Sequence, residues 1–135
     1  MMTEGKKKIL ILDDEEDICE ILKVRLSKFG FDVVIAHTSE KGYEVAVQER
    51  PALVLLDVWL KDGDEGLSFI RKLRSFRHDD PDEEDKVRRT PIIMLTNAGE
   101  TMKSLFEVEG ISDYIEKPFD ANDVKERIDK VLSRG

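Results

Sequence analysis

Five polar residues that are capable of chemistry stand directly or closely behind short apolar runs: Asp13, Asp14, Asp57, Thr96 and Lys117. Together they supply three carboxylates, one hydroxyl and one ammonium group. Carboxylates about 5 Å apart repel by roughly 3 kcal/mol per pair at an effective dielectric constant near 20, so positive charge must accompany them. A few carboxylates with water and phosphate oxygens are a usual environment for Mg²⁺. The residue types therefore predict a Mg²⁺ site suited to phosphoryl groups.

The same residues suggest how such a site would work. A bound cation and the Lys117 ammonium would keep Asp57 ionised and nucleophilic. Lys117 can hold a phosphoryl oxygen, and the short hydroxyl of Thr96 can donate one hydrogen bond to the group. Phosphoryl transfer needs mainly positioning and charge neutralisation, and these residue types provide both.

The apolar runs that precede these residues have the length of β-strands. There are five of them: residues 9–12, 33–36, 53–56, 92–95 and 114–115. Four are continuous rather than alternating, as expected of parallel strands covered on both faces. Helical patterns separate them, which predicts an α/β fold with right-handed crossovers. We expect a flavodoxin-like (βα)5 doubly wound parallel sheet in the order 2-1-3-4-5, with ligands beyond the carboxyl ends of its strands.

Five helices are expected after the five strands. The first carries an apolar stripe that includes Ile21, and Gly30 ends it. Ser39 is predicted to cap the second helix and Asp120 the fifth. Three apolar residues mark the fourth: Met102, Leu105 and Phe106.

The length of 135 residues corresponds to one domain, predicted to span 1–135 with a core from 7 to 134. The segment 77–89 holds six acidic residues and four Lys or Arg. It is therefore predicted to be a solvated, charged insertion between the third helix and the fourth strand. The net charge of −8 argues against direct binding to nucleic acid.

No apolar run is long enough to cross a bilayer, so no membrane association is expected. Cys19 is the only cysteine and cannot form an intramolecular disulfide, which favours a cytoplasmic location. On the first helix it is expected to be a buried small hydrophobe. His37 and His78 have no partner that the sequence identifies and are expected at the surface.

Four motifs together resemble the receiver (CheY-like) domain of two-component response regulators: ILILDDEED, LVLLDVW, IIMLTN and DYIEKPF. They occur in order and at matching spacing, and the resemblance covers nearly the whole chain. The resemblance implies that Asp57 accepts a phosphoryl group from a histidine kinase or a histidine phosphotransfer protein.

The resemblance also implies a set of Mg²⁺ ligands. Asp14 would bind the ion directly, and Asp13 would act mostly through water. Asp57 and the backbone carbonyl of Trp59 would complete the protein ligands. Thr96 and Lys117 would take the hydroxyl and lysine roles of the family.

A conformational switch is the function that the resemblance implies. Thr96 and Tyr114 would move on phosphorylation, with Tyr114 turning inward. The change would be read by an output protein on the face formed by the fourth helix, the fifth strand and the fifth helix. No output domain follows Gly135 in the sequence, so if the chain is the whole protein it would act by binding other proteins, and a shortened chain would look the same. A monomer or a phosphorylation-dependent dimer is expected. It would be no enzyme beyond catalysing its own phosphorylation and dephosphorylation.

Three other functions compete with this one. A haloacid-dehalogenase-type phosphatase has an Asp nucleophile and a second Asp two residues later, where this chain has Trp59. A flavodoxin-like nucleotide binder needs a Gly/Ser/Thr-rich loop after the first strand, where residues 13–16 are all acidic. An unphosphorylated pseudo-receiver that serves only for docking is the third.

Overall fold

The computed structural model describes residues 6–57, 63–96, 110–116 and 118–134. Strands and helices alternate, as the sequence predicted. The strands are β1 (Lys8–Leu12), β2 (Asp32–Ala36), β3 (Leu53–Asp57), β4 (Ile92–Thr96) and β5 (Asp113–Glu116). The described helices are α1 (Glu16–Lys28), α2 (Ser39–Glu49), α3 (Gly63–Arg74), α4 (Pro81–Arg88) and α6 (Ala121–Ser133).

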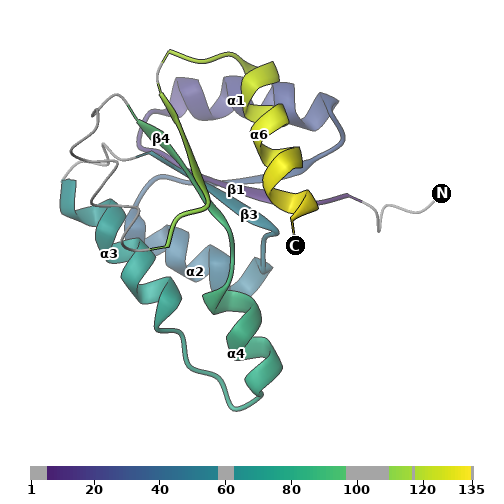
Figure 1. Ribbon diagram of the computed structural model, residues 1–135. Helices are drawn as coiled ribbons and strands as arrows, with labels where there is room; N and C mark the ends of the chain where they lie inside the picture. Colours follow the sequence, from purple (N-terminus) through teal and green to yellow (C-terminus); the bar gives the residue numbers. More distant parts are fainter. Residues whose placement is uncertain (1–5, 58–62, 97–109, 117, 135) are drawn as a thin grey trace.

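All five strands form one parallel sheet in the order β2-β1-β3-β4-β5. Figure 1 shows α1 and α6 on one face of this sheet and α2 and α3 on the other. The flavodoxin-like fold and its strand order are therefore confirmed. The sheet places β1 and β3 side by side, although β2 lies between them in the sequence.

Two separate hydrophobic clusters explain why the strand sequences are continuously apolar. Leu10 and Leu12 of β1 pack in the cluster that includes residues of α2 and α3. Ile9 and Ile11 of the same strand pack in the cluster that includes residues of α1 and α6. Successive side chains of a strand point to opposite faces, so a strand buried on both sides must be apolar at every position.

The helix ends follow the predicted signals with one exception, the cap of α2, and one residue of the α1 stripe differs from its predicted burial. Gly30, with φ of 97°, follows the C-cap of α1, and Asp120 caps α6 through the backbone N–H of Asp123. The cap of α2 is Thr38 rather than Ser39, because the Thr38 hydroxyl accepts the hydrogen bond that closes the first turn. Ile21 was placed on the buried stripe of α1, but it is 61% exposed.

The charged segment 77–89 is more ordered than the sequence suggested, because it contains α4. Asp80 caps this helix by accepting from the backbone N–H of Asp82, and Pro81 stands in its first turn. Acids in the first turn and bases in the last favour the helix dipole. Only one buried residue, Val87, anchors it inward, so there was no apolar period from which to predict it.

Arginine side chains attach α4 to the rest of the fold. The Arg74 guanidinium at the end of α3 donates to the carbonyl oxygens of Arg88 and Thr90, both at 2.8 Å, and of Gly110 at 3.0 Å. Arg50, which follows α2, forms an ion pair with Glu83 of α4 at 2.7 Å. Segment 77–89 is therefore bound to α2, α3 and the start of β4.

The helix that the sequence predicts around Met102, Leu105 and Phe106 lies outside the described residues. Among those that are described, no helix has the length and apolar character needed to cross a membrane.

Replacing Arg74 tests the attachment of α4. We expect Arg74→Met to lower the free energy of unfolding by about 1–3 kcal/mol, because three carbonyl groups lose a charged donor. Arg89→Met is the matched control, since the Arg89 side chain forms an exposed ion pair with Asp85, and its loss should change stability by less than about 0.5 kcal/mol. Urea unfolding followed by circular dichroism measures both, and equal losses would contradict the assignment.

Candidate functional site

The ends of β1 and β3 bring two acidic residues together at the carboxyl edge of the sheet. Leu12 pairs with Leu56 across the two strands. Asp13 directly follows β1, and Asp57 is the last residue of β3. Both side chains are fully buried, with 0% exposure. The strand register therefore places two carboxylates next to each other in the interior.

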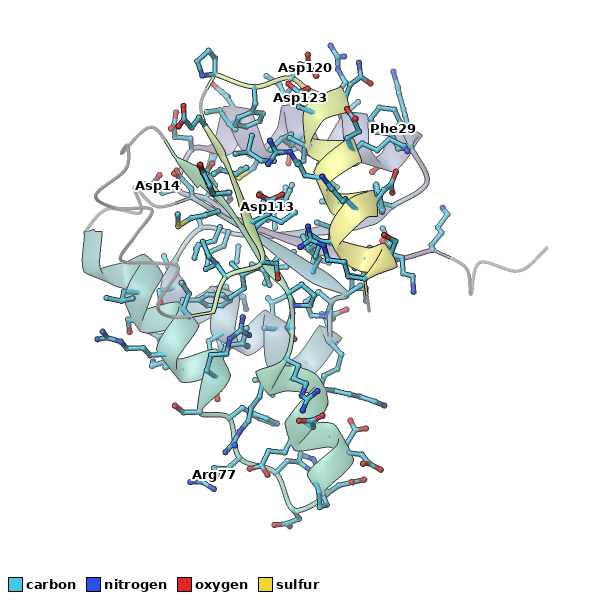
Figure 2. All side chains as sticks on the ribbon, in the orientation of Figure 1. Asp14, Phe29, Arg77, Asp113, Asp120 and Asp123 are labelled. Carbon is cyan, nitrogen blue, oxygen red and sulfur yellow. The ribbon has the colours of Figure 1, made fainter. Side chains whose placement is uncertain are left out.

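Two further acids complete the group, which we call the acidic cluster: Asp13, Asp14, Glu15 and Asp57. One carboxylate oxygen from each lies within 4.8 Å of the corresponding oxygens of the others. Asp14 is half-buried and Glu15 is exposed, so the cluster reaches from the interior to the surface. Figure 2 shows Asp14 beside the ends of the strands, two residues after the end of β1. Sequence reasoning had named three of these residues and had missed Glu15.

The main chain of Asp13 is held by its neighbours. Its N–H donates to the carbonyl of Ala36 at 3.1 Å, and its Oδ1 accepts from the N–H of Glu15 at 2.9 Å. Its carbonyl oxygen lies 2.8 Å from Nδ1 of His37 and 3.5 Å from Sγ of Cys19. His37 is exposed as expected, but it does have a partner, which the sequence could not identify.

The cluster has the donor set of a hard cation. All four ligand groups are carboxylates, and two of them are shielded from water. Negative charges buried this close together are costly unless a cation or protons compensate them. Oxygen ligands from a few carboxylates suit Mg²⁺. The residues present therefore fit the divalent ion that the sequence predicted.

The other predicted site residues are described only in part. Thr96 ends β4 and pairs in register with Glu116 of β5, so its backbone lies at the same edge of the sheet as Asp57. Its side chain, Trp59 and Lys117 lie outside the described parts of the structure. Tyr114 lies on β5, half-buried, and packs against the cluster that contains residues of α2 and α3.

Cys19 lies beneath the cluster on the first turns of α1 and is fully buried, as predicted. Burial raises the pKa of its thiol from the ordinary value of 9.0 to about 12, and the negative charge of Asp13 adds to the rise. A buried thiol beside carboxylates stays protonated, which makes it a poor nucleophile.

Comparison with known proteins identifies the family. The model of the response regulator receiver domain matches residues 9–129. The chain belongs to the response regulator receiver family. The receiver domain predicted from the four motifs is thereby confirmed, and its role is in two-component signalling.

Curated relatives of this receiver domain are transcriptional regulators. One is the "probable transcriptional regulator ycf27" of Pyropia yezoensis, 38% identical over 98% of this chain and 50% of the relative. Another is the alkaline phosphatase synthesis transcriptional regulatory protein PhoP of Bacillus subtilis, 36% identical over 95% of this chain and 49% of the relative. The chain thus spans about half the length of the curated relatives it matches.

Solved structures agree with this. A CheY-like response regulator receiver domain protein from Methanospirillum hungatei superposes with a TM-score of 0.79 at 30% identity, over 96% of each chain. The chemotaxis response regulator CheY4 of Vibrio cholerae, at 22% identity, shares the fold with a TM-score of 0.80, over 94% of this chain and 99% of that one.

The burial of Cys19 in this receiver domain leads to a prediction about reactivity. We expect iodoacetamide at pH 8 to leave the native protein unmodified and to alkylate it once in denaturant, because the thiol is both inaccessible and protonated. As pH rises above about 9, the Cys19 thiol loses its proton in the unfolded chain but keeps it in the native protein. The free energy of unfolding should therefore fall more steeply with pH in the wild type than in Cys19→Ala. Mass spectrometry and urea titrations measure these effects, and rapid alkylation of the native protein would contradict the burial.

Proposed function

We propose that this receiver domain is a phosphorylation switch in which Asp57 is the phosphoacceptor. A carboxylate oxygen of Asp57 would attack the phosphorus of a phosphohistidine, the P–N bond would break, and the histidine nitrogen would leave. The product is an acyl phosphate on Asp57. The observation that carries the proposal is the burial of Asp57 within the acidic cluster, at the end of a central strand.

Position distinguishes Asp57 from the other acids of the cluster. It ends β3, which lies between β1 and β4, so groups from both neighbouring strands surround it. Asp13 is equally buried, but it lies just beyond the end of β1 rather than on a strand. Asp14 and Glu15 are more exposed. Asp57 is therefore the acid that groups on both β1 and β4 can reach.

Mg²⁺ is the cofactor that the cluster fits best. Asp13, Asp14 and Asp57, with the backbone carbonyl of Trp59, would hold it, Asp13 mostly through water. When bound, the ion neutralises the charge that builds up on the phosphoryl oxygens. Turnover would be confined to the domain's own acyl phosphate, so the chain is a switch rather than a general phosphatase.

The signal would pass from the site along β4 and β5. Thr96 would donate a hydrogen bond to the phosphoryl group, worth about 1–3 kcal/mol when charge-assisted, and Lys117 would bind another of its oxygens. Tyr114, on the strand paired with β4, would then turn inward. A few kcal/mol at the site is enough to change the populations of two conformations.

Partners follow from this role. A histidine kinase or histidine phosphotransfer protein would supply the phosphoryl group, in the cytoplasm. An output protein or domain would bind the face made by β5, α6 and the segment before Gly110. The domain would act as a monomer or as a dimer that forms on phosphorylation. The net charge of −8 disfavours direct contact of this domain with nucleic acid.

Acetyl phosphate labelling tests the acceptor. With Mg²⁺, wild-type protein should gain one phosphoryl group by mass spectrometry and Asp57→Asn none, because an amide is not nucleophilic. Asp82→Asn, an exposed acid on α4, is the matched control and should be labelled like the wild type. Excess EDTA should abolish labelling. Labelling of Asp57→Asn at the wild-type rate would refute the acceptor, and undiminished labelling in EDTA would refute the metal.

Hydrogen exchange tests the output face. Beryllofluoride with Mg²⁺ mimics the acyl phosphate, and changes in amide protection should concentrate in residues 96–119. The same addition to Asp57→Asn should change little. Changes centred on residues 77–89 would make α4 the output surface and would overturn the proposed face.

A further inference from the structure

The end of β2 holds both main-chain groups of Asp13. The carbonyl of Ala36 accepts from the Asp13 N–H at 3.1 Å. The next residue, His37, reaches back so that its Nδ1 lies 2.8 Å from the Asp13 carbonyl oxygen. His37 is 24 residues away along the chain and belongs to none of the motifs that indicate the site.

The direction of this hydrogen bond follows from its acceptor. A carbonyl oxygen has no proton to give, so Nδ1 of His37 must carry one and donate it. Both the neutral Nδ1–H tautomer and the imidazolium have this proton, and the contact does not depend on which of the two is present. Among the described residues, a second side-chain donor to the same oxygen is the thiol of Cys19, a weak donor at 3.5 Å. His37 therefore supplies the stronger bond.

The carbonyl of Asp13 belongs to the peptide group that joins Asp13 to Asp14. That group is planar, so fixing its oxygen also fixes the direction in which Cα of Asp14 lies. The N–H of Asp13 and its Oδ1 have their own partners in Ala36 and Glu15. The bond from His37 sets the tilt of the peptide between the two acids.

We propose that His37 is a positioning residue for the acidic cluster, holding the Asp13–Asp14 peptide so that both carboxylates face Asp57. The consequence for metal binding rests on the proposed Mg²⁺ site, whereas the positioning of the peptide does not. Ligands that are held before the ion arrives cost less to order when it binds, and groups that orient ligands commonly tune metal affinity.

Two substitutions separate the donor from the rest of the side chain. In His37→Asn, the amide Nδ2 is as many bonds from Cα as Nδ1 of histidine and can donate to the same oxygen. His37→Leu keeps the bulk and removes the donor. His78→Leu is the matched control, because the Nδ1 of His78 accepts from the N–H of Asp80 beside α4. Figure 2 shows the neighbouring Arg77 at the far end of the molecule from Asp14.

The first measurement needs no metal. In EDTA, ¹⁵N spectra should show Nδ1 of His37 protonated in the wild type. The backbone amide of Asp14, whose peptide carries the bonded carbonyl, should shift in His37→Leu and stay near its wild-type position in His37→Asn and His78→Leu. The positioning role would be overturned if Nδ1 of His37 carried no proton, or if the chemical shift of the Asp14 amide were unchanged in His37→Leu.

The second measurement is Mg²⁺ affinity by calorimetry with magnesium chloride. His37→Leu should weaken binding roughly three- to tenfold, the effect of losing one hydrogen bond. His37→Asn and His78→Leu should stay within about twofold of the wild type, while urea unfolding in EDTA reports any general loss of stability. Equal weakening in His37→Asn and His37→Leu, or none in either, would overturn the inference. Wild-type protein that binds no Mg²⁺ would refute the proposed metal site instead, and the spectra in EDTA would still decide whether His37 holds the peptide.

Discussion

The pairing of β1 with β3 is the constraint on which the site depends. Leu12 lies opposite Leu56, and the chain then continues into Asp13 on one strand and Asp57 on the other. Because successive side chains alternate between faces, slipping the pair by one residue would send apolar side chains to the wrong hydrophobic cluster. Packing on both faces of the sheet thus fixes the position of two carboxylates that have no affinity for each other.

In this arrangement, hydrophobic packing of the strands keeps two mutually repelling carboxylates close together. Asp13 and Asp57 are fully buried, yet their charges repel one another in a medium of low polarity. A cation would stabilise such a site, and the phosphoryl group proposed for Asp57 would change its charge again. In the proposed switch, these changes in charge would shift the balance between two conformations of the domain.

The region around α4 adds a second network at the opposite end of the strands. Arg74 connects the end of α4 and the start of β4 with Gly110, which leads into β5. Arg50 connects the end of α2 with Glu83. Segment 77–89 is thus part of the domain's packing, and its charged side chains serve partly as internal connections rather than only as a solvated surface.

The sequence by itself determined the sheet and the acids at its edge. Continuous apolar runs predict strands buried on both faces, and Asp13, Asp14 and Asp57 follow such runs, so local pattern was sufficient. The family motifs added the expected ligands and the acceptor.

Tertiary structure decided what depends on contacts between distant segments. Helix α4 has one buried apolar residue, Val87, and is held by a cap, ion pairs and arginines that no periodicity reveals. Glu15 joined the cluster because the chain turns into α1 there. His37 found the Asp13 carbonyl only because β2 pairs with β1, which brings residues far apart in sequence within hydrogen-bonding distance. The sequence shows which chemical groups are present, whereas the pairing of the strands determines which of these groups come into contact.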